Sequence, residues 1–294
     1  MLAWLGTGIP AATAAVQDPA ASAPAVAPAA QGTAPAPAPA VKPDTKDDPD
    51  RDIRKVEPDF SVIALPTTLR VPGGAGAFRL THRFTRALNQ GSLGELPSDL
   101  FGLDNGAVIG FEYRYGIASG FQAGINRTSD ATIELFTQYD LMQQNRSKPI
   151  GLDVVVAVEG LDNLSAYYSP SIGAVLSRSL GDRAALYAQP LFVGNTNLST
   201  PTGGSDHTFM LGLGTRVRLG DSTYLVAETV PRLAGYTRDS AYVSFGLEKR
   251  AGGHMFQLNV SNGFGTTFGQ VARGVQSHDG MSWHLGFNLS RKFY

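Results

Sequence analysis

The closing stretch of the sequence, WHLGFNLSRKFY (283–294), alternates large apolar residues with small or polar ones. Side chains of a β-strand point alternately to its two faces, so this spacing predicts an amphipathic strand. A chain terminus is usually polar and frayed, whereas this one finishes on two aromatic residues. We expect the stretch to be the closing strand of a sheet, with its apolar face and aromatic end formed by Trp283, Leu285, Phe287, Leu289, Phe293 and Tyr294.

The same period of two recurs along most of the chain. It is clear in AVIGFEYRYG (107–116), ATIELFTQYDL (131–141) and IGLDVVVAVE (150–159). We count roughly 12 such segments of about 9–11 residues, the length of a membrane-crossing β-strand. No apolar run approaches the roughly 18 residues that a transmembrane helix needs.

The connections between these segments alternate between short and long. LGDR (180–183), LGDS (219–222) and RAGG (250–253) are tight-turn sequences, whereas 195–206 and 262–280 are long polar connections. Antiparallel barrels of outer membranes have short turns at one end and long loops at the other. Closure also removes the unpaired strand edges that lipid does not tolerate. We therefore predict an all-β fold, a closed antiparallel transmembrane β-barrel of about 12 strands. A soluble sandwich or lipocalin-like barrel is the alternative, because it shows the same alternation.

Composition narrows the function. The chain has 294 residues and a formal net charge of −1, so we expect no nucleic-acid partner. Charged residues make up only 17% of the chain. The absence of cysteine removes disulfides, thiol catalysis and cysteine-based metal sites.

The N-terminal part differs in composition from the rest. Residues 1–16 are apolar and small, with Ala12-Thr13-Ala14 as a cleavage motif, and we interpret them as the remnant of a signal peptide. Residues 17–59 are rich in Ala and Pro and then in charge, which predicts a disordered linker. The barrel is expected over 60–294. Within it, the apolar segment 61–72 contains two prolines, so it is an approach segment or a plug-like strand rather than a central strand.

Ionisable residues on the polar faces of the strands are the candidate site. Charges inside a narrow barrel have to be paired or hydrated. One interpretation is a Glu/Arg network that braces a filled interior, and the other is a charged constriction that selects solutes. The candidate lumen- or pore-lining residues are Glu112, Arg114, Glu134, Asp153, Glu159, Arg216, Arg218, Glu228, Glu248 and His284.

The sequence offers little chemistry for catalysis. No histidine belongs to a diagnostic pair such as HExxH. Ser205, Asp206 and His207 are the residue types of a catalytic triad, but triads are assembled from distant positions of a chain. We predict no catalytic residue, no metal site and no cofactor.

Several stretches resemble a known family. DLFGLDNGAVIGFEYRYG (99–116), EKRAGGHMFQLNVSN (248–262) and LGFNLSRKF (285–293) are similar to an uncharacterised family of bacterial outer-membrane β-barrels, known only as a domain of unknown function and found in Bacteroidetes- and Acidobacteria-type genomes. The resemblance covers about residues 60–294 and implies an outer-membrane barrel without a defined activity. The last strand resembles the strand by which the barrel assembly machinery recognises its substrates, although Arg291 departs from that pattern.

These observations predict a non-enzymatic protein of the bacterial outer membrane, either a narrow pore for small solutes or the membrane anchor of an envelope complex. Its expected partners are outer-membrane lipid, the barrel assembly machinery and a periplasmic partner bound through residues 17–59. Two alternatives stay open: an outer-membrane barrel enzyme acting on lipid or peptide, and a soluble secreted barrel that binds a ligand.

Overall fold

The computed structural model describes residues 56–89, 106–198, 207–236, 240–275 and 282–294. The expected signal-peptide remnant, residues 17–55 of the expected linker, and the Ser205 and Asp206 pair lie outside the described residues. No helix among the described residues is long and apolar enough to cross a membrane.

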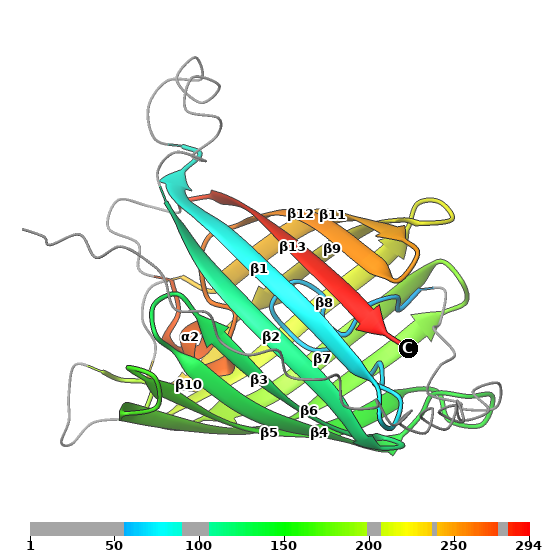
Figure 1. The fold of residues 1–294 in the computed structure, drawn as a ribbon, viewed down its shortest axis with the longest axis horizontal. Coiled ribbons are helices and arrows are strands. Elements are labelled where there is room, and N and C mark those ends of the chain that lie inside the picture. The colour runs from blue at the N-terminus through cyan, green and yellow to red at the C-terminus, as the bar shows by residue number, and fades with distance from the viewer. Residues whose placement is uncertain (1–55, 90–105, 199–206, 237–239, 276–281) are drawn as a thin grey trace, which may run out of the picture. The chain divides into compact units, whose positions relative to one another are not determined.

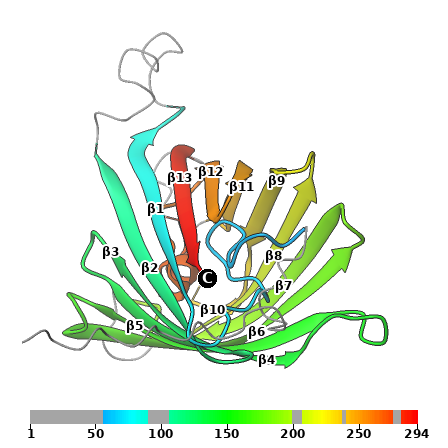
Figure 2. The ribbon, with the colours of Figure 1, turned by 45° about the vertical axis from the view of Figure 1, so that its right-hand side comes forward.

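One antiparallel sheet contains all the strands and closes on itself (Figures 1 and 2). Each long strand pairs with the next one along the chain, and the last, β13, pairs with β1. The strands are β1 (Gly76–Ala87), β2 (Ala107–Ala118), β3 (Phe121–Thr128), β4 (Ile133–Met142), β5 (Gly151–Leu161), β6 (Ala166–Leu180), β7 (Ala184–Val193), β8 (Thr208–Arg218), β9 (Thr223–Val230), β10 (Arg232–Gly235), β11 (Tyr242–Ala251), β12 (His254–Ser261) and β13 (His284–Phe293).

The ring has twelve strands, because the short β10 is not a separate member of it. β10 follows β9 directly after Pro231, and both pair with β8. A proline lacks the N–H that a sheet ladder requires, so the interruption falls where it costs least. The predicted fold, a closed antiparallel barrel of about 12 strands, is confirmed.

The closing contact joins β13 to β1 in a register that is continuous from Gly76 to Arg83 and shifts before Ala87, which pairs with His284. Phe78 pairs with Arg291 and Arg83 pairs with Gly286. The last strand is therefore paired along most of its length, as the alternation in WHLGFNLSRKFY predicts, and this pairing suppresses fraying.

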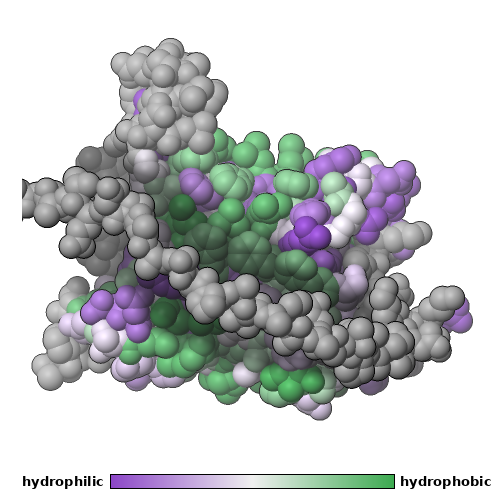
Figure 3. Space-filling view, in the orientation of Figure 1, coloured by the Kyte–Doolittle hydropathy of each residue, from purple (hydrophilic) through white to green (hydrophobic). Residues whose placement is uncertain are grey.

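The two faces of each strand differ in chemistry, as a period of two requires. Phe111 is 50% exposed on the outer face while its neighbour Glu112 is 6% exposed inside the ring. Leu135 and Glu134 show the same contrast on β4, with exposures of 41% and 4%. Apolar residues accordingly spread over the outer surface (Figure 3).

The barrel has a turn end and a loop end. Tight turns join β2 to β3, β6 to β7, β8 to β9 and β11 to β12 at the turn end, where the C-terminus also lies. The connection from β12 to β13 at the loop end contains a short helix, α2 (Phe268–Arg273). Only this helix and the segment that precedes β1 lie inside the ring (among the described residues), and they position the candidate site (Figure 1).

Residues 56–72 run inside the barrel rather than approach it from outside (Figure 2). Val62, Ile63 and Leu65 are at most 1% exposed. Residues 56–59, assigned by composition to the linker, are also buried, and Val56 belongs to an apolar cluster with Tyr187 and Val226 of the wall. Residues 61–72 therefore lie in the barrel as a plug. The part of the chain inside the barrel also includes residues 56–59, which the composition assigns to the linker.

Candidate functional site in the barrel lumen

A tight hairpin, Phe60–Thr67, occupies the lumen and is called the plug hairpin below. The amide of Thr67 donates to the carbonyl of Phe60 at 2.8 Å, and the amide of Val62 donates to the carbonyl of Leu65 at 2.9 Å. The segment enters and leaves at the turn end: Pro58 accepts a hydrogen bond from Lys292, and Gly74 donates one to Gly116. It is thus a re-entrant loop.

The amide groups at the hairpin tip are satisfied by one carboxylate of the wall. Glu228 accepts hydrogen bonds from the amides of Ile63 (3.0 Å), Ala64 (2.7 Å) and Leu65 (3.4 Å). A tight turn leaves such amides without backbone partners, and a buried unpaired amide is costly. The inward position of Glu228 on β9 therefore decides where the tip can rest.

The carbonyl groups of the hairpin are held in the same way by donors of the wall. Arg79 donates to the carbonyl of Ile63. Further donors and their acceptors are Arg216 to Ser61 (2.8 Å), Gln257 to Val62 (2.6 Å), Asn288 to Ile63 (3.2 Å), Gln189 to Pro66 (2.5 Å) and Gln138 to Thr67 (2.8 Å).

Ion pairs brace the wall around the hairpin. Arg216 binds Glu248 through two bonds of 2.7 and 2.9 Å, and neither side chain is exposed. Glu112 pairs with Arg114 and lies 3.8 Å from Arg79. Buried charges of this kind are tolerated only with excellent geometry and further hydrogen bonds, which the hairpin carbonyls provide.

Helix α2 fills the lumen from the loop end. Its first turn rests on two wall carboxylates: Glu134 accepts from the amide of Phe268 at 2.7 Å, and Glu159 accepts from the amide of Gln270 at 3.1 Å. The first amides of a helix have no partners within it, so carboxylates stabilise them. Arg273 also pairs with Glu159 at 2.5 Å.

The two fillers meet in the middle of the lumen. Ala64 and Leu65 of the plug hairpin belong to the same buried apolar cluster as Phe268 and Val271 of α2. The wall contributes inward apolar side chains such as Met210 to this cluster. The lumen therefore contains a packed core, with polar attachments on either side of it.

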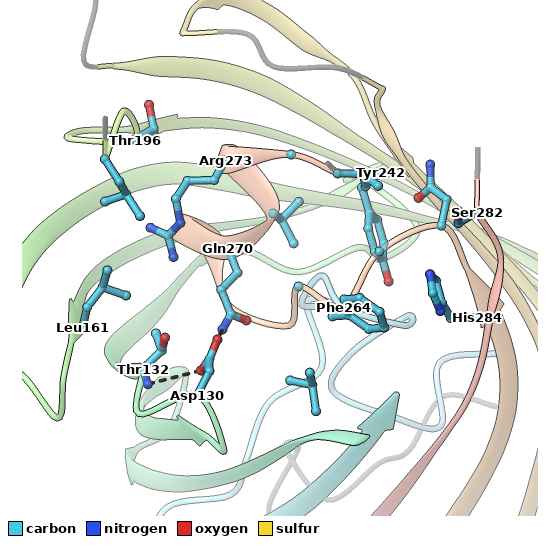
Figure 4. Close-up of a pocket in the computed structure, with 18 of the residues that line it drawn as sticks. Asp130, Thr132, Leu161, Thr196, Tyr242, Phe264, Gln270, Arg273, Ser282 and His284 are labelled. Carbon is cyan, nitrogen blue, oxygen red and sulfur yellow. Dashed lines mark hydrogen bonds between the residues drawn. The ribbon is translucent and has the colours of Figure 1, made fainter. Parts of the chain in front are cut away.

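Above α2, a cavity of about 530 Å³ lies at the loop end. Figure 4 shows Arg273 and Gln270 on one side of it and Tyr242, Phe264 and His284 on the other. The rings of Phe264 and His284 lie 4.4 Å apart. A cavity of this volume is in the range of small-molecule pockets.

The structure brings together most of the predicted lumen residues. His284 is 7% exposed and lines the loop-end cavity. The carboxylates and guanidinium groups buried inside the ring are Glu112, Arg114, Glu134, Asp153, Glu159, Arg216, Glu228 and Glu248.

The structure places two of the predicted residues differently from the prediction. Arg218, the last residue of β8, lies at the turn end and pairs with the exposed Asp221 at 2.9 Å, because that acid of the turn lies only three residues further on. Tyr294 shares the inward phase of Ser290, so it packs against the buried apolar cluster that includes Phe60 and Leu69 rather than facing outward. Phe293, in contrast, is 51% exposed on the outer face, where Leu285, Phe287 and Leu289 are half-buried and Trp283 contacts the Phe245 ring at 5.7 Å.

Sequence reasoning missed the uncharged donors that hold the plug hairpin, and it also missed Arg79. The sequence does contain a feature that points to them, since each lies in the polar phase of its strand. Charge alone does not single them out, because four of them are uncharged amides and Arg79 lies on a strand whose other phase is apolar. The missed residues are Arg79, Gln138, Gln189, Gln257 and Asn288.

The described residues contain no group of three His, Asp or Glu side chains suited to hold a metal ion. Ring and packing contacts account for the described histidines: His82 stacks on Phe287 at 4.8 Å, and His254 on Phe256 at 6.1 Å.

A closed ring with an apolar exterior and a polar interior defines the class of membrane β-barrels. The chain belongs to the family described as membrane bound beta barrel domain (DUF5777), whose model matches residues 59–293. The resemblance seen in the sequence is confirmed, and the soluble secreted barrel is not supported. No curated protein matches the sequence.

Solved structures with a similar fold are barrels of porins and channels. The KdgM porin in complex with disordered oligogalacturonate is 10% identical, with 75% of this chain and 99% of that chain covered and a TM-score of 0.46. An outer membrane channel from Pseudomonas putida F1 is 12% identical, with 76% and 97% covered and a TM-score of 0.48. A triple mutant of the Rhodopseudomonas blastica porin is 16% identical, with 65% and 56% covered and a TM-score of 0.34.

Proposed function

We propose that the protein is a non-enzymatic barrel of the bacterial outer membrane, a narrow channel for small solutes that the plug hairpin holds closed from the turn end and helix α2 from the loop end. One observation carries the proposal. The backbone of the hairpin is bound by side chains of the wall and not by strand backbone, so the hairpin can leave without opening the sheet.

The polar side chains of the wall support two states of the lumen, one filled by the plug hairpin and one filled by water. A filler with a purely structural role is better served by apolar contacts, because replacing buried ion pairs by apolar residues is often neutral or stabilising. Here Glu228, Gln257 and the Arg216–Glu248 pair face the hairpin. All of them can bind water when the hairpin is withdrawn, and a charged lining then selects solutes.

The direction of opening follows from the path of the chain. Residues 56–59 leave the lumen at the turn end, beside Ser290 and Lys292. Short turns of outer-membrane barrels face the periplasm. A periplasmic partner acting through residues 17–59 would therefore pull on the hairpin from its own side of the membrane.

A disulfide lock tests the proposal, because the chain contains no cysteine of its own. An ideal Cβ on Gly214 would lie 3.4 Å from Cγ2 of Val62, so Val62→Cys with Gly214→Cys is within reach of a disulfide. Planar-bilayer recording in KCl is made on the native chain and on the oxidised and reduced double variant. We expect rare openings of the native and reduced proteins and none of the oxidised protein.

Two results would contradict a channel that the hairpin closes. A steady open conductance of the native chain would show that the hairpin does not close the lumen. Silence of every form, including a variant with a weakened hairpin, would leave the barrel as the membrane anchor of an envelope complex.

A further inference from the structure

Acidic and basic residues are distributed differently over the strands: basic residues occur on both faces, whereas the acidic ones occur only on the inner face. All seven acidic residues of the described strands have buried side chains inside the ring, among them Asp140 with a side-chain exposure of 7%. The exposed charged residues of the described strands are all basic: Arg127, Arg178, Lys249 and Arg291. A lipid-facing surface with cations alone favours anionic groups at its border.

Lys249 lines a groove on the outer wall, and Arg291 lies on β13 two residues beyond the lining residue Leu289. The groove has a volume of about 480 Å³ and lies across β11, β12 and β13 near the turn end. Strand register places Lys249 opposite Phe256 and Phe256 opposite Leu289 in one row. The neighbouring row has Leu247 opposite Leu258 and Leu258 opposite Phe287. The groove between these rows is apolar along its length and basic at the Lys249 side.

Neither cation is neutralised by a residue that the structure describes. Within the described ranges, no carboxylate pairs with Lys249 or Arg291. The ammonium of Lys249 reaches only the hydroxyl of Thr223, at 3.3 Å, and the guanidinium of Arg291 lies 5.6 Å from the ring centre of Phe293. Long basic side chains at a barrel rim extend towards the headgroup layer while their stems lie along lipid.

We propose that this groove is a binding site for an anionic phospholipid. One acyl chain would lie between the rows formed by Leu258 and Phe256, and the headgroup phosphate would meet Lys249 and Arg291. The site is independent of conduction through the lumen, and it rests only on the barrel lying in a membrane. Apolar burial of the chain supplies affinity, and the two cations select the headgroup.

The test compares lipid retention in nanodiscs made of phosphatidylglycerol and phosphatidylcholine in equal amounts. After mild delipidation, native mass spectrometry counts the lipids that remain on the native chain and on Lys249→Gln with Arg291→Gln. We expect the preference for phosphatidylglycerol to fall about fivefold for each cation removed. Arg178→Gln is the matched control, because Arg178 is exposed near the turn end of β6, a strand that contributes no residue to the groove.

A second variant separates the contribution of the apolar groove to lipid binding from the contribution of the two cations. Leu258→Trp fills the groove and keeps both cations, so we expect it to lose bound lipid of either class. Equal loss in the Arg178 variant, full retention by Leu258→Trp, or displacement of the lipid by soluble glycerophosphoglycerol would each overturn the proposal. Heat-modifiable migration on gels confirms that each variant is folded.

Discussion

Replacing Glu228 by Gln should release the plug hairpin. The Glu228 carboxylate accepts hydrogen bonds from three backbone amides of the hairpin tip, at 3.0, 2.7 and 3.4 Å. The side chain of Gln offers only one acceptor oxygen, and its NH₂ group places a donor against the remaining backbone N–H groups. Hydrogen bonds to a charged group contribute about 1.5–3 kcal/mol and neutral ones about 1 kcal/mol. A net loss of about 2–3 kcal/mol raises the open population roughly 30- to 160-fold.

A single cysteine at the hairpin tip measures this population. Ala64 is 8% exposed and small, so Ala64→Cys introduces a buried thiol into a chain without others. Maleimide labelling should then follow the fraction of time that the tip spends outside the lumen. We expect the labelling rate of Ala64→Cys to rise by that factor when Glu228→Gln is added.

The matched control is Glu159→Gln. Glu159 is an equally buried lumen carboxylate that contacts α2 and not the plug hairpin. It should leave labelling at position 64 unchanged. If labelling is insensitive to Glu228→Gln, or rises equally in both variants, the tip is not held by Glu228 and the reasoning fails.

Two further predictions concern the other attachments. Gly269→Ala would place a Cβ 2.5 Å from Oε1 of Glu159, so we expect it to weaken the docking of α2 by about 1–3 kcal/mol, measured as faster maleimide labelling of an Ala272→Cys reporter. Arg216→Met alone should destabilise the barrel by about 3–5 kcal/mol, whereas Arg216→Met with Glu248→Leu should be close to neutral, because a lone buried charge costs more than an absent pair. Urea midpoints in detergent check the second prediction; equal midpoints for the single and double variants would contradict it.

Much of the fold was predictable because each strand shows the alternation of apolar and polar residues within its own sequence. The contrast between Phe111 and Glu112 is written into a period of two, and it holds wherever the strand lies in the ring. The closing contact of β13 with β1 was predictable for a related reason, since a sheet in lipid cannot leave an edge unpaired. Arg218 and Tyr294 show the limit of this reasoning: at the end of a strand, a turn acid or a plug residue decides the side chain's partner.

The plug hairpin was only half predictable. The prolines at 66 and 72 excluded a central strand, but they did not say that 60–67 would turn back inside the barrel. That arrangement depends on contacts between residues far apart in sequence, such as Ile63 with Glu228, separated by 165 positions. No local pattern encodes a contact of that kind.

The sequence by itself determined a closed barrel with an apolar exterior. Alternation and strand length are local properties, and they suffice to match an apolar outer face and a strand of the right length to the bilayer. Only the tertiary structure decided what the charged interior does. Glu228 and Glu248 are equivalent in the sequence, both acids on the polar face of a strand. In the folded barrel Glu228 holds the amides of the hairpin tip and Glu248 neutralises Arg216, because three-dimensional closure chooses the partner of each buried charge.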